Sequence, residues 1–268
     1  MTNQKPRLLM CPPDYYGIEY EINPWMSRSR NSDPKLAREQ WQSLYDLLTT
    51  TLGVQVELIQ PARGLPDMVF TANAGLVHGK QFIASNLRYE VRKGETPYFN
   101  RWFKDHGYTI HHLPTNYDFE GAGDVLPLGE TLFAGYRIRS NIRAHTLAGE
   151  ILGKRVLTVE LVDERFYHLD TCFCPLDSEG AIYYPSAFDD YGQRVILEHV
   201  LKPIPVSNED AVRFGCNAVV VGRNFVLQKD CVALRATLEQ QGYRVFELDL
   251  SEFIKAGGSA KCLTLLLE

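Results

Sequence analysis

Residues 124–136, D-V-L-P-L-G-E-T-L-F-A-G-Y, carry the pattern that decides the fold: two apolar runs joined by a short polar turn. The turn L-G-E is typical of a tight β-hairpin, because glycine adopts the backbone angles that such turns need. The same pattern recurs at residues 74–85, 171–185 and 217–229. The four segments begin 50, 47 and 46 residues apart, which indicates an internal repeat.

Each hairpin is followed by a stretch of helical periodicity and then by one more apolar strand. The helices are expected at residues 97–107, 140–153, 190–201 and 231–242, and the strands at 109–114, 156–162, 202–207 and 244–250. A fifth unit forms if the chain ends pair: strands at 262–267 and 7–11, a helix at 36–53 and a strand at 54–60. Five such units predict a closed, radial α/β arrangement, in which pairing of the two ends removes a free sheet edge. The alternative is an ordinary α/β domain with coincidental spacing.

Length and composition limit the classes of protein to consider. The chain has 268 residues, 45% of them hydrophobic, and a formal net charge of −5. No linker interrupts the repeat, so we expect a single domain over residues 1–268. The acidic balance argues against nucleic acid as a partner, and no apolar run is long enough to span a membrane. The oligomeric state stays open, a homo-oligomer included.

The cysteines indicate a reducing compartment and no metal. The first residues, M-T-N-Q-K-P-R-L-L-M-C-P-P-D, are too short and too proline-interrupted for a signal peptide, so we expect a cytoplasmic protein with six reduced cysteines. C-F-C at residues 172–174 lacks the spacing of a zinc site. We therefore expect no metal site.

Reactive side chains occupy one position of the repeat, next to the first strand of each hairpin. They are Asn73, Glu120, His168, Cys216 and Cys262, separated by 47, 48, 48 and 46 residues. Equivalent positions of a closed radial fold converge around one axis. We therefore expect an amide, a carboxylate, an imidazole and a thiol to meet there.

Cys262 is the candidate nucleophile. It follows the flexible G-G-S-A-K and is expected to open a buried strand. A nucleophilic thiol needs a lowered pKa, which a neighbouring histidine or positive charge supplies, and His168 is the natural acid–base partner. Asp170, two residues later, is expected on the same face of a strand as His168. Cys216 is the rival thiol, for which we favour a packing or pocket-wall role.

Glu120 opens the motif F-E-G-A-G-D, in which two glycines beside two carboxylates suit a close approach of the backbone to a ligand. Carboxylates are the bidentate partners of a guanidinium group. Asp67, in P-D-M-V-F-T-A-N, is a further carboxylate, with an exposed turn as its alternative. The pair His111 and His112 lies in a predicted strand, where adjacent side chains diverge, and is taken as structural.

These motifs resemble the guanidine-modifying enzymes of the pentein fold, which include arginine deiminases, dimethylargininases, amidinotransferases and arginine dihydrolases. The resemblance covers the whole chain: P-D-x-V-F, F-E-G-x-G-D, H-x-D and the C-terminal cysteine occur in the family's order. It implies an α/β-propeller of five ββαβ units around a pseudo-fivefold axis. It also implies a hydrolase of linear amidines that needs no cofactor.

The resemblance implies a role for each candidate residue. Cys262 would attack the guanidinium carbon, and His168 would protonate the departing ammonia and then activate water. Glu120 and Asp170 would hold the guanidinium nitrogens. The remaining substrate contacts that the resemblance implies are Asp67 near the entrance, and Arg92 and Arg139 at the substrate's α-carboxylate.

Asn73 departs from the deiminases, which carry an acidic residue in this stretch. F-T-A-N, E-I-N-P-W-M and H-L-D-T-C-F-C-P resemble the cyanobacterial arginine dihydrolases, which convert arginine to ornithine, two ammonia and carbon dioxide. In this interpretation Asn73 lets the ureido intermediate react a second time, and Asn23 is a further pocket residue. In some such relatives the domain precedes a second, ornithine-processing domain. The alternatives are a deiminase that makes citrulline, a dimethylargininase and a non-catalytic amino-acid-binding module.

Overall fold

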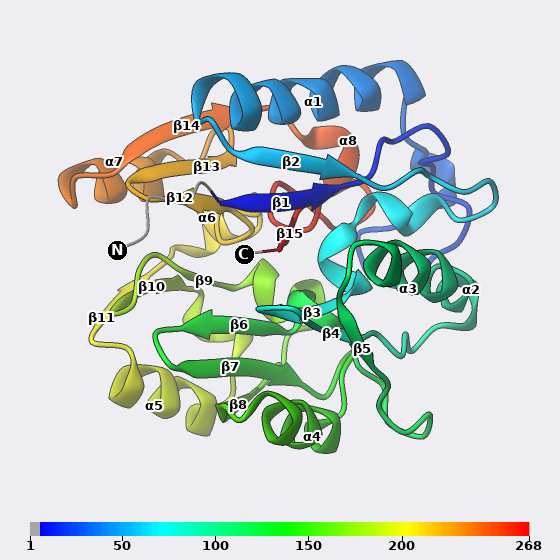
Figure 1. Cartoon of the computed structure of the whole chain (residues 1–268). Coiled ribbons are helices and arrows are strands. Elements are labelled where there is room, and N and C mark those ends of the chain that lie inside the picture. The colour runs from blue at the N-terminus through cyan, green and yellow to red at the C-terminus, as the bar shows by residue number, and fades with distance from the viewer. Residues whose placement is uncertain (1–5, 268) are drawn as a thin grey trace.

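The computed structural model describes residues 6–267, which form five separate three-stranded sheets (Figure 1). In each sheet the middle strand pairs antiparallel with one neighbour and parallel with the other. The sheets are β15 (Leu265–Leu266), β1 (Arg7–Met10) and β2 (Gln55–Leu58); β3 (Gly75–His78), β4 (Gln81–Ala84) and β5 (Thr109–His111); β6 (Val125–Leu128), β7 (Thr131–Tyr136) and β8 (Arg155–Glu160); β9 (Phe173–Pro175), β10 (Gly180–Tyr183) and β11 (Lys202–Pro205); β12 (Val219–Val221), β13 (Asn224–Gln228) and β14 (Arg244–Leu248). The structure thus confirms the five predicted units.

One longer helix connects the second and third strands of each sheet. These helices are α1 (Pro34–Asp46, continued by a π-helix at Leu47–Thr51), α3 (Thr96–Asp105), α4 (Ile142–Leu152), α5 (Asp190–His199) and α7 (Val232–Gln240). The short helices α2 (Glu90–Lys93), α6 (Asn208–Ala211) and α8 (Ser251–Ile254) and 3-10 turns at Arg28–Arg30, Pro66–Val69, Glu164–Phe166 and Pro185–Ala187 lie in the connections. Local sequence fixes the helix ends: the Asp33 side chain accepts two backbone N–H groups at the start of α1, and left-handed Gly153 ends α4.

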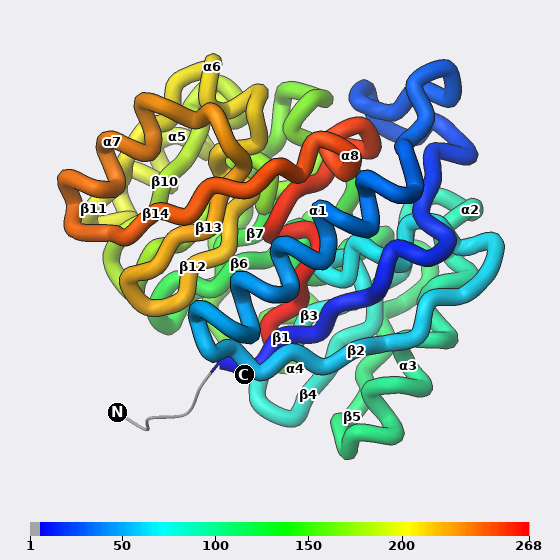
Figure 2. Tube along the Cα trace, turned by 90° about the horizontal axis from the view of Figure 1, so that it is seen from above, coloured from blue at the N-terminus to red at the C-terminus, as the bar shows by residue number. Residues whose placement is uncertain are grey.

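The chain ends join in one sheet, as the repeat predicts. Strand β1 pairs antiparallel with β15, so that Leu8 lies opposite Leu266 and Leu9 opposite Leu265. Figure 1 shows β15 near the centre and the five longer helices at the periphery, and Figure 2 gives the same arrangement from above. The last residues of the described chain are therefore part of the first structural unit.

Hydrophobic cores between the sheets close the ring. Four clusters join successive sheets, because each contains apolar residues from neighbouring units. Each cluster contains residues from different sheets. One cluster holds Leu9 and Phe82, a second Ile83 and Val125, a third Phe133, Phe173 and Phe225, and a fourth Val226 and Leu8. The five sheets are not hydrogen-bonded into one, so side-chain packing joins them, together with isolated backbone bridges such as Asn86 with Phe119 and Leu161 with Phe188.

The chain enters the innermost strands through tight turns. These turns carry His168, Asp170 and Cys262, so the prediction that the three residues lie in strands is wrong. His168 precedes a 3-10 turn at Leu169–Thr171 that contains Asp170, and Cys262 lies in a turn before β15. Similar turns occur at Thr71–Ala74 and Gly121–Gly123. Five chain segments converge at the axis, so an extended approach has no room, and the reactive residues sit on turns.

Neither a membrane-spanning helix nor a disulfide bond is present among residues 6–267. No helix among residues 6–267 is long and apolar enough to cross a membrane. All six cysteines are free and buried.

Gly121 provides a test of how closely neighbouring units approach beside the axis. Its φ is +56°, and an added Cβ would lie 2.5 Å from the backbone carbonyl of Gly75 in the preceding unit. We expect Gly121→Ala to lower the free energy of unfolding by about 3 kcal/mol, because left-handed strain adds to a clash with backbone. Gly153→Ala is the matched control: φ is +62° but the space is open, so the loss should be about 1 kcal/mol. Equal losses in urea unfolding would show that the close contact is unimportant.

Candidate active site

The turns bring the predicted residues together inside the ring. Asn73, Glu120, His168 and Cys262 are each at most 3% exposed. The Cys262 carbonyl accepts a hydrogen bond from the backbone N–H of Ala72, which joins the turns of Cys262 and Asn73. Cys216, the fifth residue in register, is buried in the hydrophobic core, in agreement with a packing role.

Glu120 is the electrostatic centre of the site. Its Oε2 lies 2.6 Å from His168 Nε2 and accepts a hydrogen bond of 3.0 Å from Arg139 Nη1. The backbone N–H of Arg88 donates to Oε1 at 3.2 Å. Burial alone would raise the pKa of Glu120, but Arg139 and the hydrogen bond with His168 hold it well below the usual range. Glu120 is therefore an ionised, wholly buried carboxylate.

His168 is a neutral base with one free nitrogen. Because an ionised carboxylate only accepts hydrogen bonds, His168 Nε2 carries the proton that Glu120 accepts. Nδ1 is then an acceptor, and it is buried without a hydrogen-bond partner. Burial lowers the pKa of His168 to about 4 although Glu120 opposes this. The ring is thus uncharged at neutral pH and can take up a proton at Nδ1.

Cys262 contacts an amide and a carboxylate. Asn217 Nδ2 donates to Sγ at 3.1 Å, and the thiol donates to Asp170 Oδ2 at 3.4 Å. Asn217 Oδ1 also accepts the backbone N–H groups of Ser259 and Cys262, which fixes the turn that carries the thiol. Burial and the Asp170 carboxylate raise the pKa of Cys262 well above its usual value. Burial likewise raises the pKa of Asp170 to about 7, while the Lys261 charge opposes it.

In the structure, Cys262 and its expected acid–base partner His168 each hydrogen-bond to other groups. His168 hydrogen-bonds to Glu120, whereas Cys262 hydrogen-bonds to Asn217 and Asp170. The sequence predicted a lowered thiol pKa, and the structure shows the opposite direction, because burial in an anionic pocket disfavours a second negative charge.

Arg92 fixes the orientation of the Asn73 amide. Its Nη1 donates to Asn73 Oδ1 at 3.1 Å, while Nε and Nη2 form a two-point pair with Glu95 at 2.8 and 2.9 Å. Arginine only donates hydrogen bonds, so the amide oxygen must face Arg92 and the NH2 group must face away. Asn73 Nδ2 is buried without a partner. It lies 2.4 Å, and His168 Nδ1 3.4 Å, from the point where a Cβ would stand on Gly123, so both free groups converge at this glycine.

Asp67 and Arg139 are buried rather than exposed. Asp67 Oδ2 lies 3.6 Å from Arg92 Nε, which excludes the exposed turn considered for it. The Arg139 guanidinium lies between the rings of Tyr89 and Tyr167, 4.8 and 4.5 Å from their centroids. Its Nη2 donates to the carbonyl of Ile22, and its Nε has no hydrogen-bond partner among residues 6–267.

A cavity of about 500 Å³ lies beside this arginine. Its lining includes Asn23, Arg88, Tyr89 and Tyr167. The two tyrosines also contact Arg139, and the Arg88 N–H donates to Glu120. The Asn23 side chain lies in the lining but donates to the Ala256 carbonyl and accepts from the Trp25 N–H. The cavity therefore lies next to residues that contact Arg139 and Glu120.

Sequence reasoning missed Asn217 and Glu95. Asn217 directly follows Cys216 in the sequence. The repeat position of Cys216 is therefore one residue away from the amide that contacts the Cys262 thiol. No sequence pattern indicated a role for Glu95, because only the short turn between α2 and α3 brings its carboxylate to Arg92. His111 and His112 do not join the site, and within residues 6–267 no group of three His, Cys, Asp or Glu side chains is placed to hold a metal.

Comparison with known proteins agrees with this geometry. The family model for N,N dimethylarginine dimethylhydrolase, eukaryotic, matches residues 19–267. The chain belongs to this family. It is 48% identical, over 97% of its length, to the bifunctional arginine dihydrolase/ornithine cyclodeaminase AgrE of Nostoc sp.. It is 39% identical over 98% of its length to the N(G),N(G)-dimethylarginine dimethylaminohydrolase of Mycobacterium tuberculosis. The chain spans 37% of the length of AgrE.

Solved structures of the family share the whole architecture. The product-bound N-terminal domain of ArgZ, a cyanobacterial arginine dihydrolase, matches with a TM-score of 0.94 at 46% identity, covering 99% of this chain and 98% of that one. Other structures of that domain are a cysteine-to-serine variant bound to substrate and an asparagine-to-serine variant covalently bound to a reaction intermediate. The predicted pentein α/β-propeller is confirmed.

The raised thiol pKa predicts slow alkylation of the free protein. Below the pKa the thiolate fraction, and hence the rate, rises about tenfold per pH unit. We expect iodoacetamide to modify Cys262 at a rate that still increases between pH 7 and pH 9, as measured by mass spectrometry of the Cys262 peptide. Cys262→Ala controls for the other five cysteines. A rate that levels off below pH 8 would reveal a resting thiolate and contradict the electrostatic description.

Proposed function

We propose that this chain is an arginine dihydrolase, which hydrolyses L-arginine to L-ornithine, two ammonia and carbon dioxide through a covalent intermediate on Cys262. The observation that carries the proposal is a buried thiol beside one carboxylate, opposite a neutral imidazole paired with another. Such a site suits a cation that brings its own positive charge.

The guanidinium group of the substrate would activate the thiol. We place it between Asp170 and Glu120, since carboxylates pair with its planar N–H groups. Its positive charge lowers the pKa of Cys262, which Asp170 alone raises. The thiol proton passes to His168 Nδ1, and the thiolate attacks the guanidinium carbon. Attack is thereby coupled to the presence of the correct cation.

His168 would then complete the first hydrolysis. Protonated at Nδ1, it gives the proton to the departing nitrogen, and ammonia leaves a thiouronium intermediate. The neutral ring next takes a proton from water, which attacks the same carbon and displaces Cys262. The product of this round is citrulline, which carries a ureido group in place of the guanidinium.

Asn73 distinguishes the second round. Its NH2 group faces the site, because Arg92 holds its oxygen. A guanidinium offers only donors, whereas a ureido oxygen accepts, so Asn73 favours the half-hydrolysed group. A second attack by Cys262 displaces the second ammonia. Hydrolysis of the resulting S-carbamoyl group gives a carbamate, which loses carbon dioxide to leave ornithine.

The remaining predicted residues would bind or support the substrate. Arg139, with Nε unpartnered, is the better candidate for the α-carboxylate, and Asn23 shapes the cavity in which that end lies. We propose that Arg92 orients Asn73 instead of binding the carboxylate, because Glu95, Asp67 and Asn73 occupy its donors. Asp67 thus acts through Arg92.

A known relative supports the dihydrolase reaction. ArgZ is an arginine dihydrolase, and its cysteine and asparagine variants hold substrate and a covalent intermediate. We propose that residues 1–268 form one catalytic domain of a cytoplasmic enzyme that acts on a small molecule without a cofactor. The 37% coverage of AgrE leads us to propose that this domain also occurs within longer proteins.

Dimethylarginine hydrolysis is the second candidate. The family match and the 39% identical mycobacterial relative favour it. The chemistry at Cys262 would be the same, with dimethylamine as the leaving group. A non-catalytic binding module would not need the thiol and the imidazole, both of which the chain retains.

Product stoichiometry tests the proposed function. We expect purified protein to release two ammonia and one ornithine per L-arginine, measured by chromatography and an ammonia assay. Cys262→Ser should reduce kcat by at least about 10³-fold, because the hydroxyl is a far weaker nucleophile, with the circular dichroism spectrum unchanged. Citrulline with one ammonia would identify a deiminase, and dimethylamine released from dimethylarginine faster than ammonia from arginine would identify a dimethylargininase.

Arg92→Lys tests the orientation of Asn73. Lysine keeps the charge beside Glu95 but cannot make the two-point pair and reach the amide together. We expect the citrulline share of the product to rise at least about fivefold, with a smaller change in KM for arginine, and Asn73→Asp to act in the same direction. Arg101→Lys, on an exposed face of α3, is the control. A large rise in KM with unchanged product ratio would return Arg92 to carboxylate binding.

A further inference from the structure

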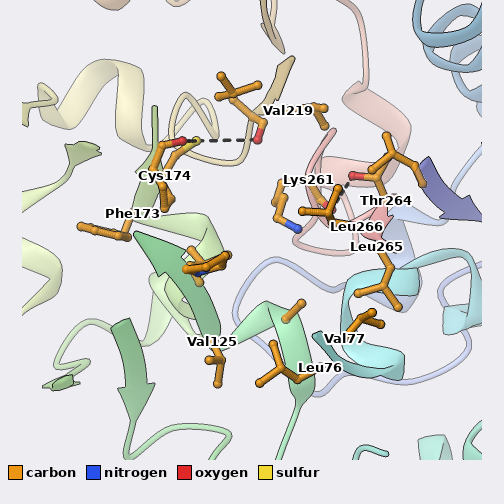
Figure 3. Close-up of a pocket in the computed structure, with 17 residues that line it drawn as sticks. Leu76, Val77, Val125, Phe173, Cys174, Val219, Lys261, Thr264, Leu265 and Leu266 are labelled. Carbon is orange, nitrogen blue, oxygen red and sulfur yellow. Dashed lines mark hydrogen bonds between the residues drawn. The ribbon is translucent and has the colours of Figure 1, made fainter. Parts of the chain in front are cut away.

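A second cavity, of about 200 Å³, lies on the axis of the ring (Figure 3). The innermost strands of all five units line it, and its wall includes Leu8, Leu76, Val125, Phe173, Val219 and Leu265. It shares no lining residue with the cavity beside Arg139. The two cavities are therefore separate spaces.

Lys261 places a single charge in this apolar space. Figure 3 shows its nitrogen pointing into the cavity. Among the described residues that line the cavity, Lys261 is the only charged one. Within residues 6–267 its ammonium has no hydrogen-bond or ion-pair partner. Lys261 is only partly buried, so water can reach its ammonium. A carboxylate that enters between the apolar walls would replace this water with a charge-assisted contact.

We propose that the axial cavity binds a small monocarboxylate with an apolar chain, whose carboxylate pairs with Lys261. Apolar cavities of about 150 Å³ hold a ring of six carbons, so the larger space here suits about eight non-hydrogen atoms. The walls accommodate the hydrocarbon chain, and the single cation selects an acid over an alcohol or an amine.

The position of Lys261 links this cavity to the thiol. Lys261 immediately precedes Cys262, and its charge favours the ionised form of Asp170. A carboxylate bound to Lys261 would cancel that charge and so favour protonated Asp170. Resting on the proposed function, this predicts that the ligand raises KM for arginine severalfold without occupying the substrate site.

Calorimetric titration with three probes of one shape tests the site: 4-methylpentanoate, 4-methyl-1-pentanol and 4-methylpentylamine. We expect the acid to bind at least about tenfold more tightly than the alcohol, the typical effect of one charge-assisted contact, and the amine not to bind. Lys261→Met should remove the advantage of the acid, and Lys261→Arg should keep it. Val220→Phe, which fills the cavity from its wall, should abolish binding of both acid and alcohol with Lys261 retained.

The same titration on Cys262→Ser saturated with L-arginine separates the two sites. Because coupling between two sites is reciprocal, saturating arginine should weaken 4-methylpentanoate binding only severalfold, to a limiting value, if the acid lies in the axial cavity. A loss of affinity that keeps growing with arginine concentration would place the acid in the substrate site and overturn the proposal. Equal affinity for acid and alcohol, or no effect of Lys261→Met, would also overturn it. Because binding is measured without turnover, these outcomes are independent of whether the protein makes ornithine.

Discussion

The ionised carboxylate of Glu120, buried at the axis, is the constraint on which the site depends. Moving a carboxylate out of water is costly unless partners compensate fully, and the partners come from separate parts of the chain. Arg139 supplies the countercharge and His168 a proton. Arg139 is in turn held by the Ile22 carbonyl. The N-terminal segment and two neighbouring units must therefore assemble around one charge before the site exists.

The ring explains why such different groups can meet. Five similar units deliver the residues at equivalent turns, so each side chain reaches the axis while its supporting strand stays in a hydrophobic core. Buried polar groups then find partners in adjacent units, as His168 does with Glu120 and Asn217 with Cys262. Packing between the sheets holds these groups rigidly, and a rigid polar site stabilises charge without reorganising.

The fold could be predicted because it is encoded locally and repeatedly. Hairpins such as β6–β7 show both apolar alternation and a glycine turn, and their spacing exposes the repeat. The tight turns at His168 and Cys262 could not be predicted, since they result from crowding at the axis. The role of Arg92 and the thiol pKa also depend on which groups become buried together. The sequence shows which side chains reach the axis, but only the structure shows which of them form hydrogen bonds or ion pairs with one another.

The electrostatics separate the two rounds of the proposed reaction. In the first round the guanidinium brings a positive charge next to Asp170 and Cys262, and so opposes the burial that keeps the thiol protonated. The ureido group of the second round is neutral and gives no such help. Stabilisation must then come from fixed donors: the Asn217 amide at the sulfur and the free Asn73 amide at the ureido oxygen. A carboxylate at position 73 would add negative charge when the substrate has lost its positive one. The amide therefore matters most for the second attack, where the substrate no longer activates its own nucleophile.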